Sequence, residues 1–553
     1  MKMKTILKRL SLISVSIFLL ATAYSQEQLP TVKTSHILTS AKMVSTNYKD
    51  TVISIDVISN VNYSVSTTKS WLHQIAMVDE KNSNNLYFHV SSNANYYERS
   101  AEIMIQDSAK KVATTVSVNQ SLDNSKSVYA TWLMIWIQKH PNTASWFTEE
   151  NVNKAQIYLN GVWRGWDWAD NTFVDDAMSK LHAAGINVLV LDLTNGWGWQ
   201  ESVVKEIQKR CVKYDMKVCV AENSTGVLST FEDHASCIYE KFAGPNAAYG
   251  DTYFKKDGKP LIVCYAIREW YNSYINSTGV NRSKFSLVWA SGEDAEVNKW
   301  GWQLVPQVGA LPSKESMYVS PSVKYSPADK NWRSHLASLD YNFTLARLNS
   351  AKYIIVGSYD DIPERNGWLP AKTDSVIPSC QFRDIYGNIS IDAYYNRVKE
   401  WTKGTPGSVA GGLIEDGAYR FLIGMKQVKV FNQDGIVGRT LKLSAKTEEM
   451  PGLFYLYHLG DNEYRIVALS GGLSLEAHAD NTISQEYDTP ENSQRWTIEK
   501  SNSGNFTVKN KQFQRYLSSE QTDNVLLNTN PKEWIIEAGL TISGKGYKAI
   551  VAP

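Results

Sequence analysis

Between residues 128 and 404 the sequence alternates short apolar runs with amphipathic helical stretches, and this alternation limits the possible folds more than any other feature. The run at 187–191 reads Asn-Val-Leu-Val-Leu, and a helical pattern at 173–184 precedes it. Strands buried on both faces read as continuous apolar runs, and their alternation with helices favours a parallel sheet. We therefore predict a parallel (β/α)8 barrel. Seven strands can be assigned, and the eighth is expected near 301–305.

The sequence on either side of this region has the residue pattern of all-β domains. Residues 31–122 show short alternating segments between Asn-, Ser- and Asp-rich turns, which predicts a β-sandwich. After residue 404 a loose threefold repeat begins, in which Phe454, Trp496 and Trp534 recur at intervals of about 40 residues. This period is typical of a three-lobed β fold with one core aromatic residue in each lobe.

Composition restricts the class of partner. The chain has 553 residues, a net charge of +1 and a pI near 7.6. This balance gives no electrostatic support for binding nucleic acid or an anionic surface. The 18 Trp and 30 Tyr residues form a large aromatic content, and flat aromatic faces are surfaces on which sugar rings stack. We expect an uncharged partner, such as a polysaccharide or glycan, and a monomeric protein.

The first 25 residues have the pattern of an export signal. A basic head is followed by the apolar segment 10–22 and by the small-x-small site Ala23-Tyr24-Ser25. No later apolar run approaches the roughly 20 residues that cross a bilayer. The sequence thus predicts an exported protein, periplasmic or extracellular, without a membrane span.

The five cysteines give no sign of a metal site. Their number is odd, and none forms a Cys-x-x-Cys pair with His at metal-ligand spacing. Cys219 and Cys264 fall within apolar runs, where a thiol behaves as a small hydrophobe. We predict no metal and no cofactor.

The most informative motif follows the apolar run 353–357. The segment 358–364 reads Ser-Tyr-Asp-Asp-Ile-Pro-Glu, which places three carboxylates, Asp360, Asp361 and Glu364, after a buried strand. Neighbouring like charges raise one another's pKa, so one carboxyl can stay protonated while another is ionised. Glycosidic bond cleavage requires this division of roles. A strand-end Asp can instead cap the next helix.

Other strand ends carry polar and aromatic residues. Active sites of parallel barrels lie at the carboxyl ends of the strands, so these residues are candidate substrate ligands. The candidates are Asp192, Glu222, Tyr265 and Glu269, together with Asp360 and the tryptophans Trp166, Trp168 and Trp197. Asp192 could equally cap a helix, Glu222 and Glu269 could pair with Arg268, and the tryptophans near 166 could pack beneath the following helix.

The segment 358–364, with Pro370-Ala371 after it, resembles the last-strand motif of glycoside hydrolase family 99 and its family 71 relatives. The resemblance implies a retaining, endo-acting α-mannosidase type of enzyme. It makes Asp361 the base that assists the sugar 2-hydroxyl and Glu364 the general acid and base. Two departures weaken the α-mannoside assignment. Asp361 is shorter than the family's Glu, a change that can cost on the order of a hundredfold in rate, and Ile362-Pro363 replaces a Trp-His pair.

The flanking regions also resemble known modules. Residues 26–123 are similar to the BACON domain, an immunoglobulin-like module of Bacteroidetes secreted proteins, through Asn-Tyr-Ser-Val-Ser at 62–66 and Val-Asn-Gln at 118–120. Residues 420–545 resemble a ricin-type β-trefoil lectin domain, whose Gln-x-Trp is kept in the second lobe at 494–496. Together with a signal peptide at 1–25 and the barrel at 128–404, these modules make the expected domain order.

The sequence thus predicts a secreted glycoside hydrolase with Asp361 and Glu364 as its catalytic residues. The alternative is a glycan-binding or adhesion protein whose barrel has lost catalysis. Burial of either acid beneath the surface would favour this alternative, whereas exposure of both to one open cleft would favour hydrolysis.

Overall fold

The computed structural model separates the chain into two compact units, which are treated individually below. The described residues are 35–80, 83–93, 99–121, 126–136, 157–165, 167–194, 200–291, 300–301, 315–319, 335–361, 366–372, 381–431, 436–447, 452–519 and 522–545. The predicted export signal lies outside them, so it stays a prediction. Among the helices described, none combines the length and the hydrophobicity that a bilayer crossing requires.

The N-terminal region folds into two four-stranded sheets, mostly antiparallel, in which β2 and β8 run parallel. Strand β3 (Thr51–Ser59) shows why, because its buried and exposed residues alternate as in a strand with one face on a core. Ile55 of one sheet and Ile103 of the other belong to the same buried cluster. The sheet orders are β1 (Ile37–Thr39)-β3-β6 (Ser83–Val90)-β5 (Leu72–Glu80) and β2 (Met43–Thr46)-β8 (Ala113–Gln120)-β7 (Arg99–Asp107)-β4 (Tyr63–Thr67).

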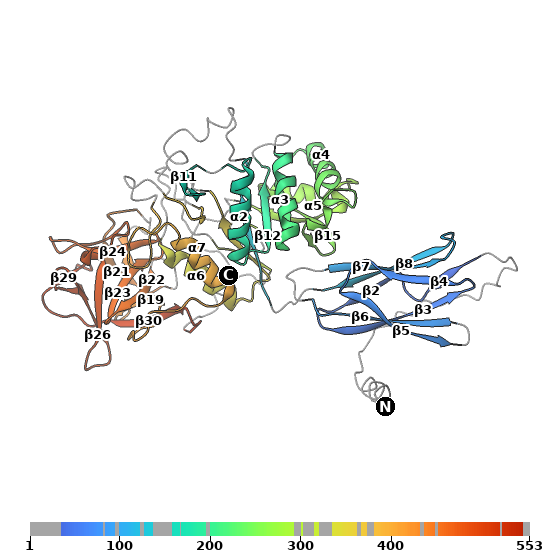
Figure 1. Ribbon diagram of the computed structural model, residues 1–553. Helices are drawn as coiled ribbons and strands as arrows, with labels where there is room; N and C mark the ends of the chain where they lie inside the picture. The colour runs from blue at the N-terminus through green and yellow to red at the C-terminus, as the bar shows by residue number, and fades with distance from the viewer. Residues whose placement is uncertain are drawn as a thin grey trace. The chain divides into compact units, whose positions relative to one another are not determined.

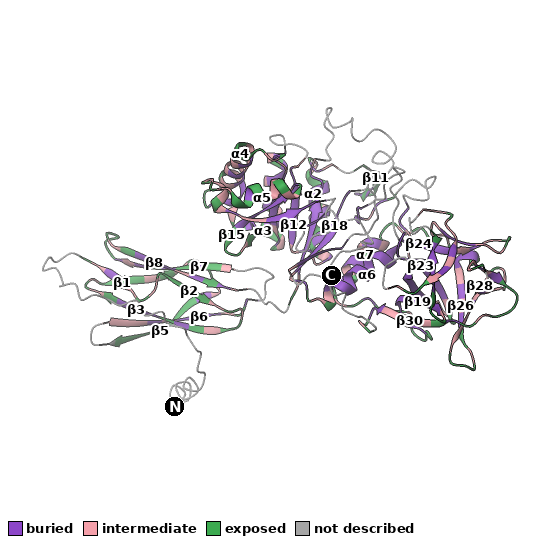
Figure 2. Ribbon diagram, turned by 180° about the vertical axis from the view of Figure 1, so that it is seen from behind, coloured by how far each residue is buried: buried purple, intermediate pink, exposed green. Residues whose placement is uncertain are grey.

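The central region contains the predicted parallel sheet. Its parallel strands lie in the order β16 (Ser286–Ala290), β15 (Lys259–Tyr265), β13 (Lys217–Glu222), β12 (Val188–Asp192), β9 (Val128–Leu133), β18 (Tyr353–Ser358) and β17 (Ser316–Val319), with β14 (Lys255–Lys256) antiparallel to β15. These strands are buried along most of their length, as the apolar runs predicted (Figure 2). Within the described part of the chain no pairing joins β16 to β17. Residues 302–305, where the eighth strand is expected, are outside that part, and closure into a barrel stays a prediction.

The helix predicted at 173–184 is present within about two residues of its expected bounds. Helix α2 (Asn171–Ala183) begins where the Asp170 carboxylate accepts a hydrogen bond from the Thr172 amide, and it buries Phe173, Ala177 and Leu181 along one face. Helix α3 (Glu201–Tyr214) packs beside α2 (Figure 1). The remaining α-helices of this region are α4 (Leu228–Ile238), α5 (Arg268–Asn276), α6 (Leu336–Leu348) and α7 (Ala393–Lys403).

The C-terminal region is an antiparallel sheet system of twelve strands. Phe454, Trp496 and Trp534 are all fully buried in its core, as the repeat predicted. The indole N–H groups of Trp496 and Trp534 donate to the carbonyls of Leu475 and Leu517, so both large side chains are buried without losing a hydrogen bond. The strands are β19 (Gly417–Ile423), β20 (Lys426–Val430), β21 (Leu441–Ala445), β22 (Phe454–Gly460), β23 (Glu463–Ala468), β24 (Leu473–Ala477), β25 (Ile483–Glu486), β26 (Arg495–Lys500), β27 (Phe506–Asn510), β28 (Tyr516–Ser519), β29 (Val525–Asn528) and β30 (Ile535–Thr541).

A buried ion pair between two helices of the central region is also bound by a tyrosine of the C-terminal region, which belongs to the same compact unit. Asp340 on α6 accepts hydrogen bonds from Arg397 and Trp401 on α7, with Nε–Oδ1 and Nη2–Oδ2 distances of 2.8 and 2.6 Å for the arginine. The hydroxyl of Tyr457 on β22 also donates to Asp340. A guanidinium that binds a carboxylate through two nitrogens is the geometry best suited to a buried pair.

Candidate active site

Several carboxylates gather at the carboxyl edge of the parallel sheet. Asp192 and Glu222 are the last residues of the adjacent strands β12 and β13, and Asp192 pairs in register with Ala221. Strand β9 lies between β12 and β18, and Asp360 and Asp361 follow β18 directly. Because parallel strands end at a common edge, these four acids lie at that edge.

Asp360 is held by two neutral donors. Its Oδ1 accepts from the Met134 amide at 2.9 Å and its Oδ2 from the Trp168 indole Nε1 at 2.6 Å. The residue is fully buried, and burial raises its pKa to about 7, although these hydrogen bonds favour the charged form. The nearby charge of Asp192 adds to the rise. Asp360 was expected to bind substrate, but both of its oxygens are directed at protein donors, so the structure makes it an anchor.

Asp361 lies one residue further along, and 3 % of its surface is exposed. Its backbone carbonyl accepts from the amides of Asn366, at 3.0 Å, and Gly367, at 2.8 Å. These bonds bring the backbone at 366–367 back against Asp361. The Asn366 side chain donates to the Tyr318 hydroxyl on β17 at 2.6 Å, which ties Asn366 to the neighbouring strand. Glu364, the second predicted catalytic residue, is outside the described residues.

The sequence left the role of Asp192 open, and the structure gives its two carboxylate oxygens different partners. Its Oδ1 accepts from the Thr194 amide at 2.8 Å, which is a local turn-capping contact. Its Oδ2 accepts from the Trp136 indole at 2.6 Å, just beyond β9. Trp136 was not singled out from the sequence, because nothing in its own neighbourhood indicates a partner 56 residues away.

Glu222 is fully buried and is bound by two groups that sequence reasoning missed. The Ser224 hydroxyl donates to Oε2 of Glu222, and Nδ1 of His234 on α4 lies 3.1 Å from the same oxygen. Oε1 of Glu222 has no hydrogen-bond partner among the described residues. The expected pairing of Glu222 with Arg268 is not seen in the described contacts. Arg268 instead places its guanidinium 5.2 Å from the centre of the Trp289 ring.

The remaining candidates are distributed differently. Tyr265, the last residue of β15, is half-buried at the same edge, whereas Glu269 is exposed in the first turn of α5. Trp168 is 1 % exposed, so it is a core residue and does not form part of a stacking rim. Trp166 and Trp197 lie outside the described residues.

No set of three or more His, Cys, Asp or Glu side chains in the described ranges is arranged to hold a metal ion.

Comparison with known proteins gives limited similarity. No family model and no curated protein matches the sequence. Among solved structures, the GH99 endo-alpha-mannosidase from Bacteroides thetaiotaomicron is 14% identical over 51% of this chain and 98% of that chain, with a TM-score of 0.38. ThreeFoil, a designed 3-fold symmetric protein, is 18% identical over 22% of this chain and 98% of its own, with a TM-score of 0.21. An exo-beta-1,3-galactanase from Clostridium thermocellum is 12% identical over 22% of this chain and 30% of its own, also with a TM-score of 0.21. Similarities of this size establish neither the fold nor the activity of this chain.

Proposed function

We propose that this protein is an exported glycoside hydrolase whose catalytic domain is a (β/α)8 barrel at 128–404. The observation that carries the proposal is the convergence of Asp192, Glu222, Asp360 and Asp361 at the carboxyl edge of one parallel sheet. Burial of several carboxylates costs free energy, and such clusters are typical of sites that use perturbed pKa values. The resemblance of 358–364 to the last-strand motif of families 99 and 71 points to the same chemistry.

The proposed roles follow from the order of residues along the chain. Asp360 anchors the chain to Met134, just beyond β9, and to Trp168 immediately before Asp361, which fixes the backbone at the position from which Asp361 extends. Asp361 would deprotonate the 2-hydroxyl of the sugar, and Glu364 would protonate the leaving oxygen and then activate water. Tyr265 and the Oε1 atom of Glu222 would contact the saccharide, whereas Asp192, whose two oxygens already accept from Thr194 and Trp136, would be a further positioning residue. Asp360 is therefore a positioning residue in this scheme.

The flanking domains would support binding to an insoluble or multivalent substrate. We assign 26–123 to a spacer or weakly adhesive module and 420–545 to a lectin-like module, so that the enzyme stays near its polysaccharide. The Gln494 side chain of the Gln-x-Trp motif accepts from Arg465 at 2.7 Å and donates to Glu476 at 2.8 Å. This residue is occupied within the fold, so sugar binding by the module would use other side chains.

A second candidate is a glycan-binding protein without catalysis. The burial of Asp361 favours it, because a base that acts on a sugar hydroxyl must reach the ligand. Under this alternative the same edge would bind a saccharide and leave its linkages intact.

The test is a glycan panel assayed with product analysis. Purified protein would be incubated with α-mannans, α-glucans and host glycans, alongside Asp361→Asn and Glu364→Gln. We expect each substitution to lower the rate at least about a hundredfold, because each removes a proton-transfer group. The unfolding midpoint should stay near that of the wild type. Asp175→Asn on α2, the same chemical change at an exposed position, is the matched control and should keep full activity.

The outcomes separate the two candidates. Full activity in either site variant would contradict the catalytic assignment. Wild-type protein that binds one of the glycans but releases no product under any condition would support the glycan-binding alternative.

A further inference from the structure

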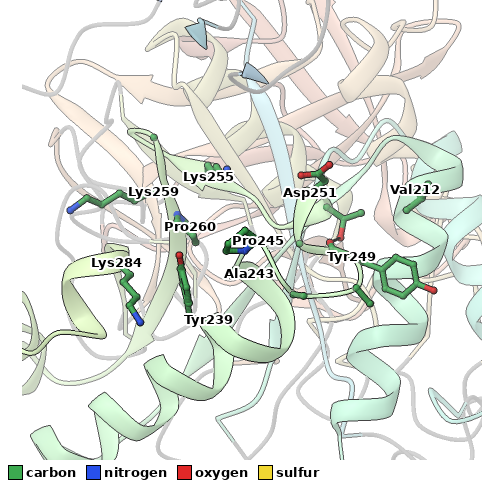
Figure 3. Close-up of a pocket in the computed structure, with 16 residues that line it drawn as sticks. Val212, Tyr239, Ala243, Pro245, Tyr249, Asp251, Lys255, Lys259, Pro260 and Lys284 are labelled. Carbon is green, nitrogen blue, oxygen red and sulfur yellow. Dashed lines mark hydrogen bonds between the residues drawn. The ribbon is translucent and has the colours of Figure 1, made fainter. Parts of the chain in front are cut away.

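A second pocket lies at the opposite end of the parallel sheet from the carboxylates. It has a volume of about 760 Å³, within the range of small-ligand sites. Its lining includes Lys259 and Pro260, which begin β15, whereas the proposed catalytic edge lies beyond Tyr265 at the other end of that strand. Figure 3 shows Lys259 and Lys284 on one side of the pocket and Asp251 on the other.

The walls of this pocket are built rigidly. Helix α4 runs into one turn of π-helix, η2 (Tyr239–Ala243), and a tight loop follows it. A Cβ on Gly244 would lie 2.5 Å from the Tyr239 carbonyl oxygen, and one on Gly250 would lie 2.3 Å from the Gly244 carbonyl oxygen, so both positions require glycine. The buried Gln208 amide nitrogen lies 3.0 Å from the Phe242 carbonyl oxygen and fixes the loop to α3. A pre-organised pocket lowers the entropy lost when a ligand binds.

The pocket also carries unneutralised positive charge. Lys255, Lys259 and Lys284 line it, and in the described part of the chain none of the three forms an ion pair with a carboxylate. Lys259 donates to the Ser283 carbonyl and Lys284 to the Asn281 side-chain oxygen, both neutral acceptors. The neighbouring Lys256 shows the contrast, because it is paired with both Asp257 and Glu315.

The arrangement of these charges indicates the kind of anion. The three lysines come from three elements, β14, β15 and the short helix η4 (Arg282–Lys284), so their charges are carried at separate points of the lining. Lysine acts as a point charge, and the lining has no arginine fork of the kind that grips a single phosphate or carboxylate in two places. Tyr239 and Tyr249 add aromatic faces and hydroxyl groups to the walls.

We propose that this pocket binds an acidic oligosaccharide, one that carries uronate carboxylates or sulfate esters on successive sugars. Separated anionic groups would each meet one lysine, and the sugar rings and hydroxyls would meet the tyrosines. The inference does not depend on the hydrolase activity, because the pocket and the proposed catalytic edge use different residues.

Isothermal titration calorimetry of the full chain tests this inference. The probes are trigalacturonate and a sulfated chondroitin tetrasaccharide, with neutral mannotriose and inorganic phosphate for comparison. We expect both acidic probes to bind more tightly than the other two, and their affinity to fall as salt increases. Lys255→Ala and Lys284→Ala should each weaken binding about fivefold, and the triple variant with Lys259→Ala about a hundredfold.

Two further variants keep the result interpretable. Lys500→Ala on β26 removes the same charge from an exposed position in the C-terminal region and should leave the affinity unchanged. Ala248→Trp adds bulk at an exposed lining position and should weaken binding without removing charge. The inference is overturned if neither acidic probe binds, if the lysine variants bind as well as wild type, or if phosphate binds as tightly as the oligosaccharides.

Discussion

Asp340 and Asp360 are both completely buried aspartates of the same compact unit, yet their surroundings differ in charge. Asp340 meets the guanidinium of Arg397, and two further donors complete its hydrogen bonding. Asp360 accepts from an amide and an indole, both neutral, and its pKa rises to about 7. A buried carboxylate that meets a cation therefore forms an ion pair whose charges compensate each other. A buried carboxylate that meets neutral donors can change its protonation near neutral pH.

The largest expected effect comes from breaking the ion pair at Asp340. Asp340→Leu leaves the Arg397 charge buried without its counter-ion, so the free energy of unfolding should fall by about 3–5 kcal/mol. Chemical denaturation would measure the change. The double variant Asp340→Leu, Arg397→Met should recover a large part of this loss, because it removes both charges. A double variant as unstable as the single one would show that the loss does not come from the unpaired Arg397 charge.

The pH dependence of the free energy of unfolding should distinguish Asp360 from Asp340. Its folded-state pKa is raised, so folding is favoured when the group is protonated, and this contribution is lost as the pH rises from about 4 towards 7. The shift corresponds to at most about 4 kcal/mol. In Asp360→Asn, the stability difference from wild type should therefore shrink over that window. A constant difference from pH 4 to 8 would contradict the raised pKa.

Removing one donor from Asp360 should have a smaller effect. Trp168→Phe deletes the indole N–H that binds Oδ2, with an expected loss of about 1–3 kcal/mol from the lost bond. It should also raise the pKa of Asp360 further, since a bond to the charged form is lost. Trp300→Phe is the matched control, because Trp300 is equally buried but its N–H has no hydrogen bond among the described residues. Equal destabilisation by both substitutions would assign the loss to packing alone.

The smallest effect concerns three thiols that are buried, as Asp360 is. Burial raises the pKa of Cys211, Cys219 and Cys264 and keeps these thiols neutral. In a Cys380→Ser background, a thiol reagent should modify the half-buried Cys237 first in the folded protein. The other three should react only on unfolding. Rapid modification of all four would mean that the parallel strands open locally.

The local sequence pattern was sufficient to predict the parallel strands and much of the sheet edge at which the candidate site lies. The apolar runs predicted the parallel strands, and the position of Asp192, Glu222 and Asp360 after such runs predicted where these acids gather. The role of Asp360 could not be predicted in this way. Its partner Trp168 is 192 residues away, and in the sequence that tryptophan is equally consistent with a stacking surface. His234 likewise lies on a helix with no local sign that it contacts Glu222.

By itself, the sequence determined which segments are strands and helices, which aromatic residues lie in the C-terminal core, and that acids follow the strands. These properties depend on hydrophobic periodicity, which acts between residues close in the chain. Only the tertiary structure decided which buried acid meets a cation and which meets neutral donors, since Asp340 and Tyr457 are 117 residues apart. Charge compensation depends on distance in space, and a carboxylate's chemistry is set by the groups that fold against it.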